Sequence, residues 1–477
     1  MQAQSILTIE ECRKLAVEHN RSLMIAQERT NIATESRKAV FTQFLPNFSA
    51  NASYIRNEKN ISLLSADALL PVGTKMSNGS FGFTQDQISN KWMQVSPGVY
   101  APLDSDGKPF DPTVNPEKIL WKNYALLPKE SMEFDTKDIY AGTVGFVQPI
   151  FLGGKVRELY KMSKSAEKLA GINQDKAVDD LIMDVDEAYW RVVSVENKRK
   201  LAVEYLNLMK KLRKNVEIMI EEGVATKGDL LKVMVKENEA EMILAKAENG
   251  LSLSRMALNQ ICGLEINKEY ALSESNLENT TNVTPVQPNI SMIDKRFEIR
   301  ALNEAKNIAG STYKIAQSRF MPNLILSGNY LFSNPNVYNG FSNKFAGMYS
   351  FGVVLNVPIF HFGDRIHTLR AAKSEVRIAE LQLEEAKEKI ELQINQSNFK
   401  IDESQRRLTM ANKNVDKANE NLKFANEAFD AGLVTSTELM EAQTAWYSAS
   451  SENIDSKIEV KMCELYLKKA IGQSLDK

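Results

Sequence analysis

The chain has 477 residues and a formal net charge of −2 at pH 7, so it lacks the basic excess that is typical of a nucleic-acid-binding protein. It contains no run of about 18 apolar residues, so the sequence predicts no transmembrane helix. The opening MQAQSILTIEE has no basic start and no apolar stretch, so we expect no signal peptide in this chain. Such a start fits a cytosolic protein, and it fits equally a mature chain whose leader has been replaced.

Residues that commonly carry chemistry are rare in this sequence. The three cysteines show no metal-ligand spacing, so we expect free structural thiols and no metal site; they are Cys12, Cys262 and Cys463. The three histidines lie far from any serine or cysteine in a catalytic motif; they are His19, His361 and His367. The sequence therefore predicts neither an enzyme nor a cofactor.

The first predicted element is a helix from about Thr8 to Leu45. Beyond Pro46, apolar and polar side chains alternate, which predicts a strand whose apolar positions are Phe48, Ala50, Ala52 and Tyr54. A second alternating run ends at Pro149. Residues 57–139, between the two runs, are rich in Gly, Pro, Asn and Ser, and we expect them to form an insert between the strands.

A very long helix follows the second strand. Residues 155–222 contain no proline and one glycine, which predicts a helix of roughly 100 Å at 1.5 Å per residue, a length typical of coiled coils. In the following GVATKGD, Gly223 ends this helix, Thr226 is an expected N-cap and Asp229 completes a near capping box for a helix over 226–261. A tight helical hairpin accounts for this local chemistry without any further role.

The same plan then recurs. Four positions of the first copy return at one constant spacing, since Pro149, Gly154, Gly223 and Gly263 recur as Pro358, Gly363, Gly432 and Gly472. The segment around Pro46 recurs around Pro322, at a longer spacing because the insert lies between. A constant register over this length indicates an internal duplication, and we call positions related by these two registers equivalent. We therefore expect a first repeat in residues 1–264, a polar linker in residues 265–289 and a second repeat in residues 290–477.

The second repeat contains two more alternating runs, one after Pro322 and one before Pro358, and a long helix over 364–431. Apolar residues recur every seven positions in this helix, which indicates a left-handed coiled coil; they include Ile394, Ile401, Leu408, Val415, Leu422 and Phe429. The turn GLVTSTE repeats the helix stop and near capping box of the first copy, with Gly432, Thr435 and Glu438.

Each of the four predicted strands has one apolar face and one small or polar face. The pattern fits an ordinary sheet on a soluble core, and it also fits a membrane barrel with its apolar face in lipid. Four strands cannot close a barrel and lipid does not tolerate open edges, so the second interpretation requires several chains around a rotation axis. A cytosolic coiled-coil scaffold would explain the helices but not the strands, and a passive porin would not need such long helices.

The order of the motifs, in duplicate, resembles the TolC-like outer-membrane efflux proteins. The N-terminal LTIEECRKLAVEHNRSL is similar to the opening helix of that family, and the resemblance covers most of the chain outside residues 57–139 and the linker. It implies an α+β membrane protein and a homotrimer. Four strands per chain would form a 12-stranded β-barrel that is continuous with a long α-helical coiled-coil barrel.

The resemblance also implies a function. The protein would be an outer-membrane exit duct that extends into the periplasm, with its leader removed. It would carry substrates from an inner-membrane transporter and a periplasmic adaptor (membrane fusion) protein to the outside, and it would open at its periplasmic helical tips. Outer-membrane lipid would surround the strands, and residues 57–139 would form an extracellular loop. The sequence names no cargo.

Three groups of site residues follow from the resemblance. The pore gate with its acidic ring corresponds to Asp229, Glu438, Glu441, Phe429, Val434 and Leu439. The adaptor-binding tips correspond to Gly223, Val224, Thr226, Gly432, Leu433 and Thr435. The strand–helix transitions correspond to Pro46, Pro149, Gly153, Gly154, Pro322, Pro358 and Gly363. An arginine of the family falls on Val434 and a tyrosine on Phe429, so we expect a more apolar or a looser closure in place of an ionic lock.

Overall fold

The computed structural model describes residues 6–82, 84–88, 91–114, 116–273, 287 and 289–473, and the chain separates into two compact units. The helical unit consists of residues 1–43, 152–322 and 357–477. The strand unit consists of residues 44–151 and 323–356. Of the predicted linker, residues 274–286 and 288 lie outside the described residues.

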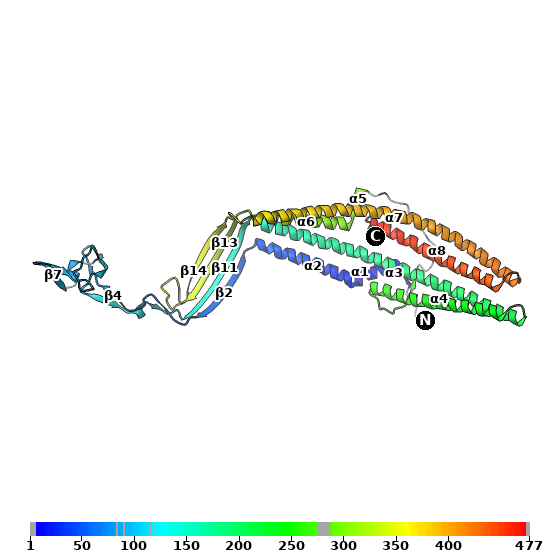
Figure 1. The fold of residues 1–477 in the computed structure, drawn as a ribbon, viewed down its shortest axis with the longest axis horizontal. Helices are drawn as coiled ribbons and strands as arrows, with labels where there is room; N and C mark the ends of the chain where they lie inside the picture. Colours follow the sequence, from blue (N-terminus) through cyan, green and yellow to red (C-terminus); the bar gives the residue numbers. More distant parts are fainter. Residues whose placement is uncertain are drawn as a thin grey trace. The chain divides into compact units, whose positions relative to one another are not determined.

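The described part of the helical unit contains two sets of four α-helices (Figure 1). The first set is α1 (Ile9–His19), α2 (Arg21–Phe41), α3 (Lys155–Glu221) and α4 (Lys227–Ile261). The second set is α5 (Ile290–Lys295), α6 (Phe297–Ser318), α7 (Asp364–Asp430) and α8 (Ser436–Ala470). The two predicted long helices are confirmed, since α3 and α7 each have 67 residues.

The prediction of a single helix from Thr8 to Leu45 is wrong, because the helix is interrupted at Asn20. The backbone of Asn20 is extended, with φ −72° and ψ 123°, and its side chain accepts a hydrogen bond from the Ser22 N–H at 2.8 Å. Asparagine is a strong N-cap residue, so it ends α1 and starts α2. After α2, a short 3₁₀ turn, η1 (Thr42–Phe44), precedes Pro46.

The same junction occurs in the second repeat at the equivalent position, Arg296. The Asn20 amide donates a hydrogen bond to the carbonyl of Ile261, at the end of α4, over 3.1 Å. The Arg296 guanidinium donates to the carbonyls of Ala470 and Lys469, at the end of α8, over 2.9 and 2.6 Å. Ile261 and Ala470 are also equivalent positions, so the two repeats share this hydrogen bond between equivalent residues.

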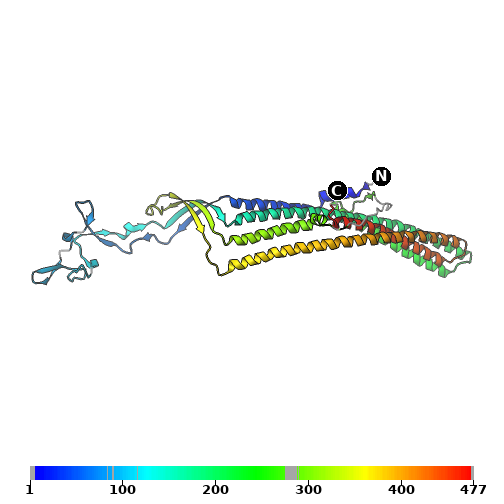
Figure 2. The ribbon, with the colours of Figure 1, turned by 90° about the horizontal axis from the view of Figure 1, so that it is seen from above.

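Helices cover α3 along its whole length. Figure 2 shows α2, α3, α6 and α7 side by side in this order, and α3 packs against both α2 and α6. Farther along the chain, α3 packs against α4 and α8, and the α3–α4 and α7–α8 hairpins reach their turns at the same end of the unit (Figure 1). The shorter helices α2 and α4 therefore follow one another along a single long helix, α3.

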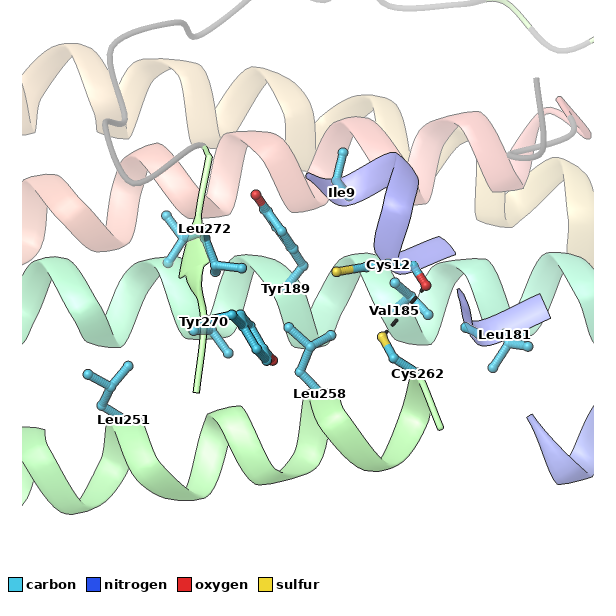
Figure 3. Close-up of a cluster of buried hydrophobic side chains, with 13 residues drawn as sticks. Ile9, Cys12, Leu181, Val185, Tyr189, Leu251, Leu258, Cys262, Tyr270 and Leu272 are labelled. Carbon is cyan, nitrogen blue, oxygen red and sulfur yellow. Dashed lines mark hydrogen bonds between the residues drawn. The ribbon is translucent and has the colours of Figure 1, made fainter. Parts of the chain in front are cut away.

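The largest described hydrophobic cluster joins α1, α3 and α4. Figure 3 shows Ile9 and Cys12 of α1 opposite Val185 and Tyr189 of α3, with Leu258 of α4 closing the group. Two short parallel strands, β1 (Ile6–Leu7) and β12 (Ala271–Leu272), lie next to this cluster and bring the start of the linker to the N-terminal segment. All three cysteines of the chain are buried.

A smaller cluster joins α3 to α8, and we call it the α3–α8 contact. It contains Met183 and Trp190 of α3 and Met462 and Leu465 of α8, together with Ile182. On α7, the predicted seven-residue series is confirmed over Ile394, Ile401, Leu408 and Phe429, all of which are buried. None of the described helices combines the length and the apolar character that crossing a membrane requires.

The four predicted strands are confirmed and form one sheet in the order β14, β13, β11, β2. They are β2 (Asn47–Arg56), β11 (Asp138–Leu152), β13 (Asn323–Asn334) and β14 (Ala346–Asn356). Pairing of β2 with β11 is antiparallel from Arg56 and Asp138 to Asn47 and Val147. β11 extends past Pro149 to Leu152, so the expected strand end at this proline is wrong, although the pairing with β2 does stop before it.

Apolar side chains remain exposed on this sheet. Tyr349, Phe351, Val353 and Leu355 of β14 share one face, because side chains alternate along a strand, and all four are exposed. Tyr349 has 71% of its surface exposed. An ordinary sheet on a soluble core would bury such a row of side chains. The exposed row therefore favours the alternative in which this face contacts lipid.

The insert between β2 and β11 consists of short antiparallel pairs. Their strands are β3 (Ile61–Ser62) with β10 (Glu133–Phe134), β4 (Ala68–Pro71) with β9 (Tyr124–Leu127), β5 (Thr74–Lys75) with β6 (Phe81–Gly82), and β7 (Trp92–Ser96) with β8 (Val99–Pro102). Its base contacts the β13–β14 loop, since the Asn343 amide donates to Asp135 over 2.8 Å and the rings of Phe134 and Phe341 are 5.1 Å apart.

Gly153, shortly before α3, gives a test of how closely the start of α3 approaches the end of α6. Gly153 has φ +61°, and a β-carbon there would lie 2.6 Å from the Ser318 carbonyl oxygen and 2.7 Å from Cβ of Met321. We expect Gly153→Ala to lower the free energy of unfolding by roughly 2 kcal/mol through backbone strain and overlap. Denaturant unfolding followed by circular dichroism at 222 nm measures this.

The matched control is Gly171→Ala, within α3, where a β-carbon would meet nothing within 4 Å. This change is expected to raise stability by about 0.5–1 kcal/mol, because alanine favours a helix interior. Equal stability of the two variants would contradict the close approach at Gly153.

Candidate functional site: the turns of the two helical hairpins

The turns that end α3 and α7 have the same backbone. Gly223 has φ +82° and Gly432 has φ +70°, a left-handed conformation that glycine adopts without strain. The Val224 N–H donates to the Met219 carbonyl over 2.9 Å, and the Leu433 N–H donates to the Ala428 carbonyl over 2.8 Å. Both turns are glycine-terminated helix ends of the kind that the sequence predicts.

Each turn continues into a complete capping box. The Thr226 hydroxyl accepts from the Asp229 N–H over 3.3 Å, and the Asp229 carboxylate accepts from the Thr226 N–H over 3.2 Å. At the second turn the corresponding distances between Thr435 and Glu438 are 3.3 and 2.7 Å. The predicted caps of α4 and α8 are therefore confirmed.

The two capping carboxylates are held in their ionised form. Hydrogen bonds from the hydroxyl and backbone N–H of Thr226 lower the pKa of Asp229. Hydrogen bonds from the backbone N–H and the hydroxyl of Thr435 lower the pKa of Glu438. A carboxyl with a lowered pKa stabilises the fold above its unfolded pKa, and this contribution is lost only as the pH falls through the lowered value.

One apolar cluster lies beneath both turns. Phe429, Leu439 and Val434, for which the family resemblance implies a place at the gate, pack together there with Leu212 and Val216 of α3 and with Val233 of α4. In the single chain these three side chains thus join the two hairpins to each other. The acidic side chains are placed differently, since Glu438 and Glu441 are exposed and Asp229 is half-buried.

Apolar side chains project from both turns. Val224 is 66% exposed and Leu433 is 79% exposed. They are equivalent positions of the two repeats, each directly after its glycine. Exposed aliphatic side chains at two equivalent positions are typical of a contact surface, whereas a turn that only reverses the chain does not require them.

A ladder of contacts between α3 and α8 was not predicted. Lys469 bonds to Asp180 over 2.7 Å, the Tyr466 hydroxyl donates to Glu187 over 2.7 Å, and Lys198 pairs with Asp455 at 2.7 Å. The rings of Tyr205 and Tyr447 stack with centroids 4.7 Å apart. Along α3 the spacing of these partners follows the helical repeat and places them on one face. That periodicity could have indicated a contact face on α3. It could not have indicated the partners, because they lie on α8 in the other repeat.

Most of the predicted transition residues lie at element boundaries within their own units, whereas Pro149 lies inside β11, three residues before its end. Gly154 and Gly363 have φ +84° and +89° and are the N-cap residues of α3 and α7. Pro46 and Pro322 each directly precede a strand, β2 and β13, and Pro358 lies shortly after the end of β14. Among the described residues, no group of three or more His, Cys, Asp or Glu side chains is placed to hold a metal ion.

Comparison with known proteins identifies the family. The sequence pattern of the family described as outer membrane efflux protein matches residues 127–264 and 291–473, which is more than half of the chain. The chain belongs to the outer membrane efflux protein family. The matched segments correspond to most of the two repeats, and the resemblance to TolC-like channels is confirmed.

The fold agrees with solved members. The structure matches the CmeC outer membrane channel of Campylobacter jejuni with a TM-score of 0.72 and 15% identity, over 98% of this chain and 86% of that one. It matches the MtrE outer membrane channel of Neisseria gonorrhoeae, in its open state, with a TM-score of 0.72 and 18% identity, over 98% and 89%. It matches the outer membrane protein VceC of Vibrio cholerae with a TM-score of 0.70 and 16% identity, over 97% and 96%.

A curated relative is similar over a shorter region. Protein CyaE of Bordetella pertussis is 24% identical over 320 residues, which is 66% of this chain and 65% of that protein. The match therefore spans less than two thirds of CyaE. CmeC and MtrE are described as outer membrane channels and VceC as an outer membrane protein. The coarse assignment of this chain to outer-membrane efflux follows from the family.

The cap of α8 gives a test of the turn. We expect Thr435→Ala to cost about 1 kcal/mol by removing the hydroxyl that caps α8, and hydrogen exchange at the Glu438 and Leu439 amides to become about fivefold faster. Thr437→Ala, in the same turn but outside the capping box, is the matched control and should leave this exchange near wild type. Equal effects of the two changes would show that the box does not stabilise the turn.

Proposed function

We propose that this protein is the outer-membrane exit duct of an efflux or secretion system. It takes substrates from an inner-membrane transporter through a periplasmic adaptor and releases them outside. The observation that carries this proposal is the combination, in one chain, of a four-stranded sheet with an exposed apolar face and two helical hairpins built on 67-residue helices. A coiled-coil scaffold does not need such a sheet.

The sheet supports an assembly of three chains. Its apolar row on β14 suits the lipid face of a membrane barrel, in which side chains alternate between lipid and lumen. Four strands are too few to close a barrel, and an open edge in lipid leaves backbone groups without partners. Three copies would supply 12 strands, enough to close a barrel with an internal channel, and a homotrimer has the rotation axis that this requires.

The duplication indicates how neighbouring copies would meet. The positions equivalent to members of the α3–α8 contact are Leu392 and Phe399 on α7 and Leu253 and Met256 on α4. These four side chains are exposed in the single chain, with Phe399 at 75%. The residues equivalent to the α3–α8 contact therefore lie exposed on α7 and α4. In a ring, α7 of one chain would pack against α4 of the next and bury them.

The hairpin turns would receive the adaptor and form the gate. Val224 and Leu433 offer exposed aliphatic contacts at Gly223 and Gly432 for an adaptor. Closure would come from the apolar cluster of Phe429, Val434 and Leu439, and the ring of acids would comprise Asp229, Glu438 and Glu441. In a ring, further negative charge near Asp229 and Glu438 would raise the pKa of both groups, which opposes the effect of their caps.

The experiment that tests the proposed function uses the full chain from the membrane fraction. We expect extraction to require detergent, the particle to have the mass of three chains, and the protein to conduct ions in a planar bilayer. A detergent-free monomer with intact helical structure would contradict the exit duct and would favour a scaffold. A trimer that does not conduct ions would contradict the exit duct but would support the assembly of three chains.

The acidic ring has a separate test. We expect the double change Glu438→Gln and Glu441→Gln to lower the cation-to-anion permeability ratio by roughly twofold, because acidic rings favour cations in narrow pores. Block by multivalent cations should weaken, while trimer stability stays near wild type, because glutamine also completes a capping box. Single-channel reversal potentials in a salt gradient measure the ratio.

The matched control changes the same charge at the other turn. Glu221→Gln with Glu222→Gln removes two exposed carboxylates at the end of α3, outside the predicted ring. Its permeability ratio should remain near wild type. If both double variants leave selectivity and block unchanged, Glu438 and Glu441 face outward and the predicted ring is wrong.

A further inference from the structure

Two cysteines from opposite ends of the first repeat meet in the cluster of α1, α3 and α4. Cys12 lies in the second turn of α1 and Cys262 is the C-cap residue of α4, and neither has any exposed surface. The Cys262 thiol donates a hydrogen bond to the Cys12 carbonyl oxygen over 3.6 Å (Figure 3). The cluster thus holds the two residues against each other in the folded chain.

The two thiols are also close enough to affect each other's ionisation. A side-chain hydrogen bond with Cys262, together with burial, raises the pKa of Cys12. The same hydrogen bond lowers the pKa of Cys262 against the effect of burial. In the folded chain Cys262 is therefore the thiol of the pair with the lower pKa, and the fold places the two cysteines as neighbours, as a disulfide requires.

The surrounding junction is tightly packed on the side of Cys262. Gly263 follows it with φ +69°, and a β-carbon there would lie 2.6 Å from Cβ of His19, at the end of α1. The Asn20 amide bonds to the Ile261 carbonyl on the other side of Cys262. The end of α4 is therefore held close to α1 from both neighbours of the cysteine.

The second repeat fastens the same junction differently. There Arg296, which is buried, donates charge-assisted hydrogen bonds to two carbonyls at the end of α8. In the first repeat the equivalent residue is Asn20, with one neutral bond. The position equivalent to Cys262 is Ile471, which cannot form a covalent link. The first junction therefore lacks the charge-assisted hydrogen bonds that stabilise the second. Of the two junctions, only the first contains a pair of thiols.

We propose that Cys12 and Cys262 form a disulfide bond in the exported protein, which fastens the N-terminal helix α1 to the end of α4. This inference rests on the proposed function, because an outer-membrane duct faces the oxidising periplasm, where disulfides persist. Cys463 lies in a different cluster, with Ile394 and Leu467, and stays a thiol.

The reaction is a thiol–disulfide exchange with an external disulfide, either a protein oxidant or a small-molecule disulfide. The thiolate of one of the two cysteines attacks one sulfur of the oxidant, breaks its S–S bond, releases the first thiol and forms a mixed disulfide. The other cysteine then gives up its proton and attacks the protein sulfur of the mixed disulfide, which forms the bond between the two cysteines and releases the second thiol. The oxidant leaves as two thiols, so it gains the two electrons and two protons that the cysteines lose. Because both sulfurs are buried in the folded chain, oxidation takes place before α1 docks.

The bond would constrain the unfolded chain over a long loop. It closes the segment from α1 to the end of α4, which contains the first two strands and the insert. A link of this length restricts the denatured ensemble more than a short one does. The expected effect is a melting temperature that falls by several degrees on addition of a reductant, without a change in the helical content at low temperature.

The experiment uses the full chain from the outer-membrane fraction, denatured without reductant in the presence of iodoacetamide, so that buried free thiols are alkylated as well. We expect mass spectrometry to find a peptide pair joined through Cys12 and Cys262, with only Cys463 alkylated. A non-reducing gel should show faster migration than a reduced sample, because the closed loop keeps the denatured chain more compact. Alkylation of all three cysteines would overturn the disulfide.

Variants and a second preparation separate the possible failures. Cys463→Ser should keep the mobility shift, and Cys12→Ser or Cys262→Ser should remove it; a shift that survives either of the latter changes would overturn the pairing. If the chain fractionates with the cytosol, the proposed function fails. Purified full-length chain, unfolded, refolded in oxidised glutathione and then denatured with iodoacetamide, decides the pairing in that case. A Cys12–Cys262 link would support it there, and three alkylated thiols would overturn it.

Discussion

A helix as long as α3 cannot cover its own apolar side chains, and this constraint underlies the helical unit. At 1.5 Å per residue such a helix is roughly 100 Å long, and most of its stability has to come from neighbours along its whole length. In this protein α3 meets that need with a succession of shorter helices, α2 and then α4 on one side, and α6 and then α8 on the other. The remaining features of the unit follow from where those shorter helices begin and end.

Every end of a short helix leaves backbone groups without helical partners. The turns at Gly223 and Gly432 satisfy theirs locally, with carbonyls bonded across the glycine and N–H groups bonded to capping side chains. The ends of α4 and α8 are satisfied from a distance, by Asn20 and Arg296. The turns can therefore project away from the rest of the unit, whereas the other ends are fixed to the N-terminal helix of each repeat.

The sequence predicted those features that depend on neighbours close in the chain. The long helices, the four strands and both capping boxes rest on composition or on contacts within one helical turn, and the structure confirms them. The break at Asn20 was missed because no glycine or proline marks it, although asparagine is an N-cap signal. The role of Arg296 and the α3–α8 ladder could not be predicted, since each needs a partner in a distant part of the chain.

The exact spacing of the two repeats has a consequence for how this protein can change during evolution. In the proposed ring, an ancestor with one repeat would have used one set of residues for every contact between helical hairpins, so a substitution would have altered all of these contacts together. After duplication, the contact inside the chain and its exposed copy are encoded separately. Each half can then acquire features that the other lacks, as the insert before β11 and the arginine before α6 illustrate. Divergence of the halves is the freedom that fusing two repeats into one gene provides.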